Sequence, residues 1–439
     1  MLENVPLSHV DSRTSGARAP SRSRQLLAAS VGNLVEWYDW YAYSFLAMYF
    51  ADQFFPSKDA LSFVPLLATF GVFAAGFFMR PIGGLLLGAI ADRRGRRTAL
   101  TLSIALMGAG SLVIALCPTY AQIGVLAPIL LVAARLAQGL STGGEYAAAA
   151  TFMIESAAPH RRGLFSSFWY LSSSTGKIIC LALVASISTA LGEMAMGDYG
   201  WRIPFLVGAA AAATGWWIRR HAEETHQLAE QIKDGRAQRP GLFEFIQRYP
   251  RQAGQVFGLT VGPAVCVYTW TAFLPTYAVI TAGFGKAQAL TVGTISLIFF
   301  ALIQPLGGTL SDRIGRKPML MAFAAGSAIA TVPLLNAIGT SFWSLLLVQC
   351  TGMVLLTGYT SIAAATTVEL YPSRVRGTGI GFPYSMAMAL FGGTTPTVGT
   401  WLHSIGHSDW FGWYIIGCVL VTLITCLTLR ETFRAPLPT

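Results

Sequence analysis

The feature that most constrains this chain is a series of twelve apolar runs, each about as long as a helix that crosses a lipid bilayer. They lie at about 25–50, 62–91, 98–117, 123–156, 164–190, 202–220, 253–280, 287–311, 318–338, 343–369, 375–402 and 410–430. A helix needs about 20 residues to span a hydrocarbon core about 30 Å thick. Charged residues are only 11% of the chain, whereas soluble domains carry about a quarter. We therefore predict an all-α membrane protein with twelve transmembrane helices.

A repeated motif divides the chain into two related halves. The stretches from Gly88 to Arg97 and from Gly308 to Lys317 both read Gly-x-x-x-Asp-Arg-x-Gly-Arg followed by a basic residue. Each copy lies between two apolar runs. We therefore predict two pseudo-symmetric six-helix bundles with flanking segments, namely a tail at 1–24, bundles at 25–220 and 253–430, a charged linker at 221–252 and a second tail at 431–439. Part of the linker is expected to form an amphipathic helix on the membrane surface.

The basic residues indicate how the helices are oriented. All but six of the 30 Lys and Arg residues fall in the tails, the linker and alternate loops, on what is then one side of the membrane. Such a bias marks the cytoplasmic side, so both termini are expected in the cytoplasm. The same bias accounts for the net charge of +10 without a nucleic-acid partner, and no removable signal peptide is evident.

The sequence lacks the residue patterns that most enzymatic active sites use. The six cysteines all lie in apolar runs without C-x-x-C spacing, which is typical of small buried hydrophobic residues. We find no serine-nucleophile motif, no metal-ligand cluster and no histidine in the centre of a span. We therefore expect no cofactor, no metal site and no enzymatic activity.

Six charged residues lie well inside the predicted spans, namely Glu36, Asp39, Arg80, Arg135, Glu145 and Lys177. A charge in hydrocarbon costs at least about 2.5 to 3.5 kcal/mol, so these groups must pair with one another or line a polar cavity. Salt bridges between helices would explain Arg135 and Glu145 equally well. A binding site explains Arg80 and Lys177 better, because stability alone is a weak reason to keep buried ion pairs. All the intramembrane cations lie in the first half, which favours an anionic ligand.

The second half offers polar and aromatic residues in place of charges. Tyr268, Gln304 and Tyr359 each interrupt an apolar run, and they are candidate ligand contacts, although such residues more often pack than bind. Further candidates of the same kind are Thr269, Trp270, Tyr277, Thr360, Ser361 and Tyr384.

Together these motifs resemble those of the major facilitator superfamily. The resemblance rests on the paired Gly-x-x-x-Asp-Arg-x-Gly-Arg loops, the Arg-x-x-Gln-Gly of Arg135–Gly139, and two loops that begin at Glu155 and Glu369 and end in Arg-Gly. Within that superfamily, the stretches at 33–44, 76–84, 134–146 and 200–205 are similar to the metabolite:proton symporters, and most like the 2-oxoglutarate permeases.

The resemblance implies a carrier in a bacterial inner membrane that alternates access to one central site and is driven by the proton gradient. One monomer suffices for this mechanism, with a small carboxylate, protons and the lipid bilayer as partners. Three groups of residues are then expected. The substrate site comprises Arg80, Lys177, Tyr268, Gln304 and Tyr359; proton coupling involves Glu36, Asp39, Glu145 and Arg135; the gate comprises Asp92, Arg96, Asp312 and Arg316.

Lys177 departs from the pattern of the 2-oxoglutarate permeases, which have a neutral polar residue there. An added central cation points to another di- or tricarboxylate. The alternative within the family is a proline or betaine symporter, which has less use for a surplus cation. A transporter-like receptor usually needs a longer cytoplasmic segment than the nine residues after Arg430.

Overall fold

The computed structural model describes residues 22–59, 62–94, 96–142, 145–220, 244–373 and 375–438, and every regular element in these ranges is a helix. The prediction of an all-α protein is thus confirmed. The part of the predicted linker at 221–243 lies outside the described residues. The helix α10 (Glu244–Arg248) forms part of the remainder.

The described helices form twelve spanning segments, six in each half of the chain. The first six are α1 (Arg22–Phe54), α2 (Val64–Arg94), α3 (Arg96–Leu116), α5 (Leu126–Ser141) with α6 (Glu145–Glu155), α7 (Arg162–Ala195) and α8 (Arg202–Arg220). The second six are α11 (Pro250–Tyr268) with α12 (Leu274–Ala282), α13 (Lys286–Ile314), α14 (Arg316–Asn336), α15 (Phe342–Thr360) with α16 (Ala363–Val368), α17 (Arg376–Ala387) with α18 (Thr395–Ser404), and α19 (Trp410–Thr428). Nearly all of these bounds lie within a few residues of the predicted runs.

Eight of the helical segments in the described ranges are long and apolar enough to cross a bilayer by length and composition. The four that fall short are α1, α5 with α6, α8, and α17 with α18. In α1 and α5, the intramembrane charges Glu36, Asp39 and Arg135 are buried inside the protein. Apolar side chains occupy the outer surface instead. Leu302 and Leu306, one turn apart on α13, are each 69% exposed, as expected of a face that contacts lipid.

Several spans are interrupted where the sequence predicted continuous helix. The run at 123–156 is divided, with α4 (Tyr120–Ile123) before it and a break after Ser141 that separates α5 from α6. π-helical turns at Thr269–Phe273 and Met388–Gly392 interrupt the spans that contain α11 and α17. Irregular backbone of this kind is tolerated at membrane depth only inside the protein, and it often marks functional regions.

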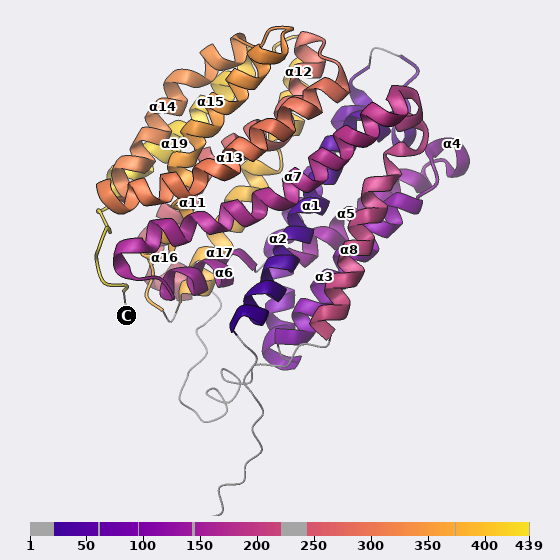
Figure 1. The fold of residues 1–439 in the computed structure, drawn as a ribbon. Helices are drawn as coiled ribbons and strands as arrows, with labels where there is room; N and C mark the ends of the chain where they lie inside the picture. The colour runs from indigo at the N-terminus through magenta and orange to yellow at the C-terminus, as the bar shows by residue number, and fades with distance from the viewer. Residues whose placement is uncertain are drawn as a thin grey trace, which may run out of the picture.

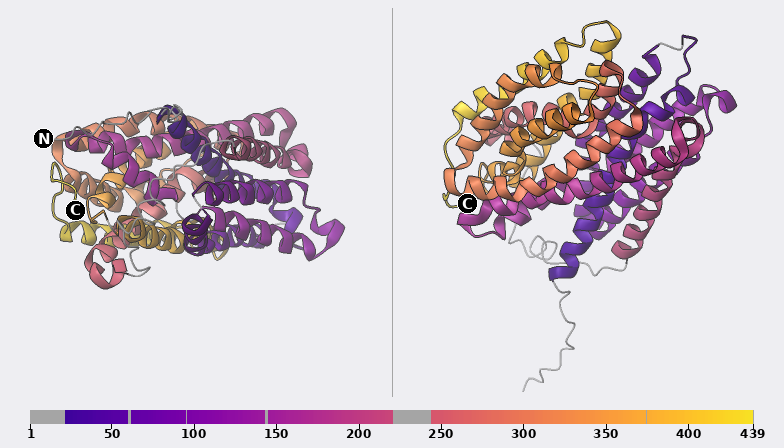
Figure 2. Two further views of the ribbon diagram at one scale, coloured as in Figure 1. Left: turned by 90° about the horizontal axis from the view of Figure 1, so that it is seen from below. Right: turned by 45° about the horizontal axis from the view of Figure 1, so that its top comes forward.

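The two halves meet along a long boundary. In Figure 1 the first half, indigo to magenta, and the second half, orange to yellow, form two groups of helices, and α7 runs beside α13 where they meet. The two further views in Figure 2 show the same division. Within the first half, α2 and α5 approach closely because Gly76 faces Gly139. A Cβ atom on Gly139 would lie 2.0 Å from the Gly76 carbonyl oxygen.

Candidate functional site

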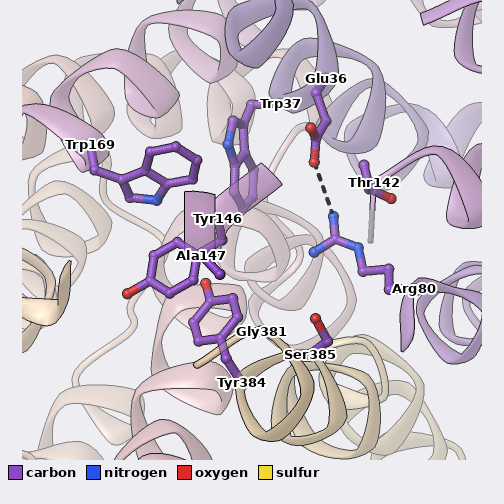
Figure 3. A pocket seen from close by; sticks show the side chains of 10 residues that line it. All are labelled: Glu36, Trp37, Arg80, Thr142, Tyr146, Ala147, Trp169, Gly381, Tyr384 and Ser385. Atoms are coloured by element: carbon purple, nitrogen blue, oxygen red, sulfur yellow. Dashed lines mark ion pairs between the residues drawn. The ribbon is translucent and has the colours of Figure 1, made fainter. Parts of the chain in front are cut away.

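A pocket lies between the two halves of the protein. Its lining comes from α1, α2, α6 and α7, the residue that follows α5, and α17 of the second half. The residues are Glu36, Trp37, Arg80, Thr142, Tyr146, Ala147, Trp169, Gly381, Tyr384 and Ser385. Figure 3 shows these side chains converging on one space, with Glu36 and Arg80 on one side and the rings of Tyr146 and Tyr384 beside each other.

Arg80 is the cation of this pocket. Its side chain is buried, and its Nη2 lies 3.8 Å from Oε1 of Glu36, close enough for an ion pair but too far for a hydrogen bond. Its guanidinium carbon also lies 4.5 Å and 4.4 Å from the ring centroids of Trp40 and Phe77. Aromatic faces stabilise a buried cation only partly. Arg80 therefore keeps bonding capacity for a ligand.

A second charged cluster lies behind the pocket. The Arg135 Nη1 donates a hydrogen bond to Gln138 Oε1 at 2.8 Å, and both Gln138 and Ser111 donate to the Asp39 carboxylate. The ring of Trp40 contacts Arg135 at 4.3 Å as well as Arg80, so one indole links the two charged groups. Asp39 and Arg135 thus meet through Gln138, but neither lines the pocket, and their role in proton coupling stays a prediction.

Lys177, on α7, is completely buried. Its ammonium nitrogen lies 4.6 Å from the ring centroids of both Trp37 and Tyr41. Among the described residues it has no hydrogen-bond partner. Because Arg80 also lies 5.9 Å from the Trp37 centroid, the two cations flank a single indole. The structure therefore places both predicted substrate residues near Trp37, but only Arg80 lines the pocket, and the role of Lys177 in binding stays a prediction.

The predicted contacts of the second half are less closely associated with the pocket. Tyr268 stacks on Tyr41 with ring centroids 6.1 Å apart. Gln304 exchanges hydrogen bonds with Thr357 and Thr360 of its own half. Neither these two predicted residues nor Tyr359 is among the residues that line the pocket. Their role in binding stays a prediction.

Sequence analysis did not single out several of the lining residues. Trp37, Trp169 and Tyr146 lie in stretches rich in aromatic and apolar residues, where aromatic side chains usually pack. Trp37 follows Glu36 directly, and Tyr146 follows Glu145. Proximity to an intramembrane carboxylate was therefore the available signal. The side chain of Glu145 lies outside the part of the chain that the structure describes.

One end of the boundary is closed by charged groups, and we call it the basic end. Asp312 of α13 accepts hydrogen bonds from the backbone N–H groups of Gly163 and Leu164, both at 2.8 Å. These N–H groups belong to the first turn of α7, where backbone N–H groups have no acceptor within their own helix. Arg316 lies 2.9 Å from Asp312. The side chains of Asp92 and Arg96, the equivalent pair in the first half, lie outside the described residues.

The two loops that begin at Glu155 and Glu369 pair with each other at the basic end. The Glu155 carboxylate pairs with Arg376, and the Glu369 carboxylate lies 3.8 Å from Arg162. Each loop therefore contributes one glutamate and one arginine to ion pairs with the other half. Burial raises the pKa of Glu369, and Arg316, 3.6 Å away, opposes that shift. Both loops were recognised in the sequence, but this exchange of ion pairs was not predicted.

The opposite end is closed by uncharged and aromatic contacts. Tyr41 and Thr271 share a hydrogen bond of 2.7 Å across the boundary. Farther out, the rings of Phe63 and His403 lie 4.6 Å apart in an edge-to-face arrangement. The two halves are therefore in contact on both sides of the pocket.

The chemistry available in the pocket is recognition and ion pairing. Its lining combines one cation, one carboxylate, four aromatic side chains and four hydroxyl groups, two of which belong to tyrosines, with a second cation behind Trp37. Within the described ranges, no group of three His, Cys, Asp or Glu residues could hold a metal ion.

Comparison with known proteins agrees with this architecture. The chain is 41% identical to the alpha-ketoglutarate permease of Escherichia coli over 425 residues, which cover 96% of each protein. It is 33% identical to the citrate-proton symporter of Salmonella typhi, covering 91% of this chain and 92% of that protein. It is 31% identical to the proline/betaine transporter of Escherichia coli, covering 94% and 84%.

Among solved structures, the D-xylose-proton symporter superposes with a TM-score of 0.70 at 18% identity, covering 95% of this chain and 98% of that one. The sequence profile of the Major Facilitator Superfamily matches residues 29–382 and 259–438. Together with the twelve-helix fold, these matches show that the chain belongs to the Major Facilitator Superfamily.

Proposed function

We propose that the protein is a proton-coupled symporter that imports a small organic anion, a di- or tricarboxylate similar to 2-oxoglutarate, by alternating access. It acts in a bacterial inner membrane with the basic end and both termini in the cytoplasm, since basic loops are retained on that side. The named permease and citrate symporter among the relatives support an anionic substrate.

The observation that carries the proposal is the pair of buried cations around Trp37. Lys177 has no hydrogen-bond acceptor among the described residues, and the contact of Arg80 with Glu36 is longer than a hydrogen bond. Burying charge without such partners is costly. A dianion that reaches from one cation to the other would supply the missing acceptors and lower that cost.

The aromatic lining offers a competing interpretation. Trp37, Tyr146, Trp169 and Tyr384 could form a cage for a quaternary ammonium group, as in betaine. A cage needs free ring faces, however. Lys177 already covers one face of Trp37, and Tyr146 and Tyr384 stack on each other with centroids 3.9 Å apart. The remaining ring edges carry partial positive charge and favour an anion.

Coupling to protons follows from competition for Arg80. When the substrate anion binds Arg80, Glu36 loses its counter-charge, and protonation of Glu36 becomes favourable. The loaded site then carries substrate and proton together. Release of both on the cytoplasmic side restores the ion pair between Glu36 and Arg80. Asp39 and Glu145 remain alternative proton carriers.

The basic end acts as the cytoplasmic gate in this scheme. Closure places Asp312 on the first turn of α7 and pairs Glu155 with Arg376 and Glu369 with Arg162. Opening would break these contacts and expose the charges to water, where they are readily solvated. Such a network is therefore suited to switching between two rigid arrangements.

The test is uptake of radiolabelled 2-oxoglutarate into proteoliposomes under an inward proton gradient, with citrate, succinate, malate or betaine as unlabelled competitors. We expect gradient-driven uptake that polycarboxylates inhibit and betaine does not. Inhibition by betaine alone would instead favour the osmolyte symporter. If no anion is taken up or competes, the proposed function is wrong.

A further inference from the structure

Two tryptophan side chains of the pocket have donor groups that nothing else in the described structure uses. Trp37 on α1 and Trp169 on α7 both line the pocket, and only 4% and 6% of their surfaces are exposed. Neither indole nitrogen has a hydrogen-bond partner among the described residues. A buried indole N–H usually has an acceptor, so these two require an explanation.

Other tryptophans show what is particular to this pair. Trp201 is also fully buried, but its indole nitrogen donates to Gln53 Oε1 at 3.3 Å. Trp40 lacks an acceptor as well, but it lies outside the lining, against the guanidinium groups of Arg80 and Arg135. Among the tryptophans in the described part of the chain, only Trp37 and Trp169 combine an unpartnered donor with a place on the pocket wall.

The donors and acceptors of the pocket are out of balance. Arg80 keeps its Nε and Nη2 without hydrogen-bond partners among the described residues, and the two indoles add one donor each. An indole nitrogen donates only and cannot accept. The carboxylate of Glu36 already faces Arg80. A ligand with several acceptor oxygens would satisfy these unpartnered donors.

We propose that Trp37 and Trp169 are specificity-determining residues that donate their indole N–H groups to oxygen atoms of the bound anion. This inference rests on the proposed anion symport and adds to it the means of selection. Arg80 and Lys177 attract negative charge of any kind, whereas hydrogen bonds from the two indole donors favour binding of a ligand with a second carboxylate. A monocarboxylate leaves at least one of these buried donors unpaired, and that loss lowers its affinity.

The experiment measures Kd by calorimetry on the purified full-length protein in detergent, with glutarate and valerate as probes. These two acids share a five-carbon chain and differ by one carboxylate. Wild type is expected to bind glutarate more tightly. Trp37→Phe and Trp169→Phe, which remove the N–H and keep an aromatic ring, should each weaken glutarate binding about tenfold or more and valerate binding much less.

Trp343→Phe is the control, because Trp343 is 67% exposed and does not line the pocket. Equal losses for glutarate and valerate, or none, would overturn the inference and indicate that the rings only pack. If a Phe variant does not fold, replacement by benzothienylalanine keeps the bicyclic shape and removes only the N–H. Binding of betaine but of no anion by wild type would instead refute the proposed function itself.

Discussion

Replacing Asp312 with Asn should open the basic end. Asp312 accepts two backbone hydrogen bonds from the first turn of α7, both 2.8 Å long, and those N–H groups have no acceptor in their own helix. Hydrogen bonds to a charged group contribute about 1.5 to 3 kcal/mol each, and an Asn carbonyl can replace one of them by a neutral bond of about 1 kcal/mol. The closed state should therefore lose about 2 to 5 kcal/mol, or roughly 30- to 4,000-fold in its equilibrium with the open state.

Amide hydrogen exchange measures how often these two backbone hydrogen bonds open. In Asp312→Asn, the N–H groups of Gly163 and Leu164 should exchange faster by a factor approaching the change in the equilibrium. Arg313→Gln is the matched control, because Arg313 is the exposed neighbour of Asp312 and should leave the exchange of these two groups unchanged. Wild-type exchange rates at Gly163 and Leu164 in Asp312→Asn would refute the assignment of Asp312 to the gate.

Three further predictions concern the boundary and the site. Gly308→Ala should keep the two halves apart at the basic end, because its Cβ would lie 2.5 Å from the Gly163 carbonyl oxygen. Gly417→Ala is the control, since a Cβ there has no atom within 4 Å and should leave the basic end closed. Cysteine accessibility from the cytoplasmic side measures the difference between the two variants. Lys177→Met should raise the melting temperature by removing a buried charge and weaken dicarboxylate binding at least about tenfold, and unchanged affinity would contradict the substrate role. Glu36→Gln should keep substrate exchange across proteoliposomes but abolish accumulation driven by a proton gradient; accumulation at wild-type levels would assign the proton to another carboxylate.

The spans were predictable because the bilayer imposes their length and polarity on the sequence. Nearly all of the predicted runs end within a few residues of the helices, and the intramembrane charges Arg80 and Lys177 do lie at one interior place. The break after Ser141 was not predicted, since a helix inside a bundle can be interrupted wherever its neighbours satisfy the freed backbone groups.

Contacts between the two halves were harder to predict from the sequence than the spans were. The exchange of Glu155 with Arg376 and of Glu369 with Arg162 depends on how two related units face each other, which the repeat alone does not specify. Trp37 and Trp169 were missed for a different reason. An aromatic residue in an apolar run has the same local signature whether its edge faces a pocket or a neighbouring helix.

The proposed coupling moves anion and proton together through one site. It is tested most directly by enclosing a pH-sensitive dye in proteoliposomes and adding 2-oxoglutarate or citrate outside, with no imposed proton gradient. We expect an anion that the protein carries to acidify the lumen, and we expect Glu36→Gln to abolish this signal while Trp343→Phe preserves it. Substrate uptake without any acidification, or with loss of protons from the lumen, would show that anion and proton do not enter together.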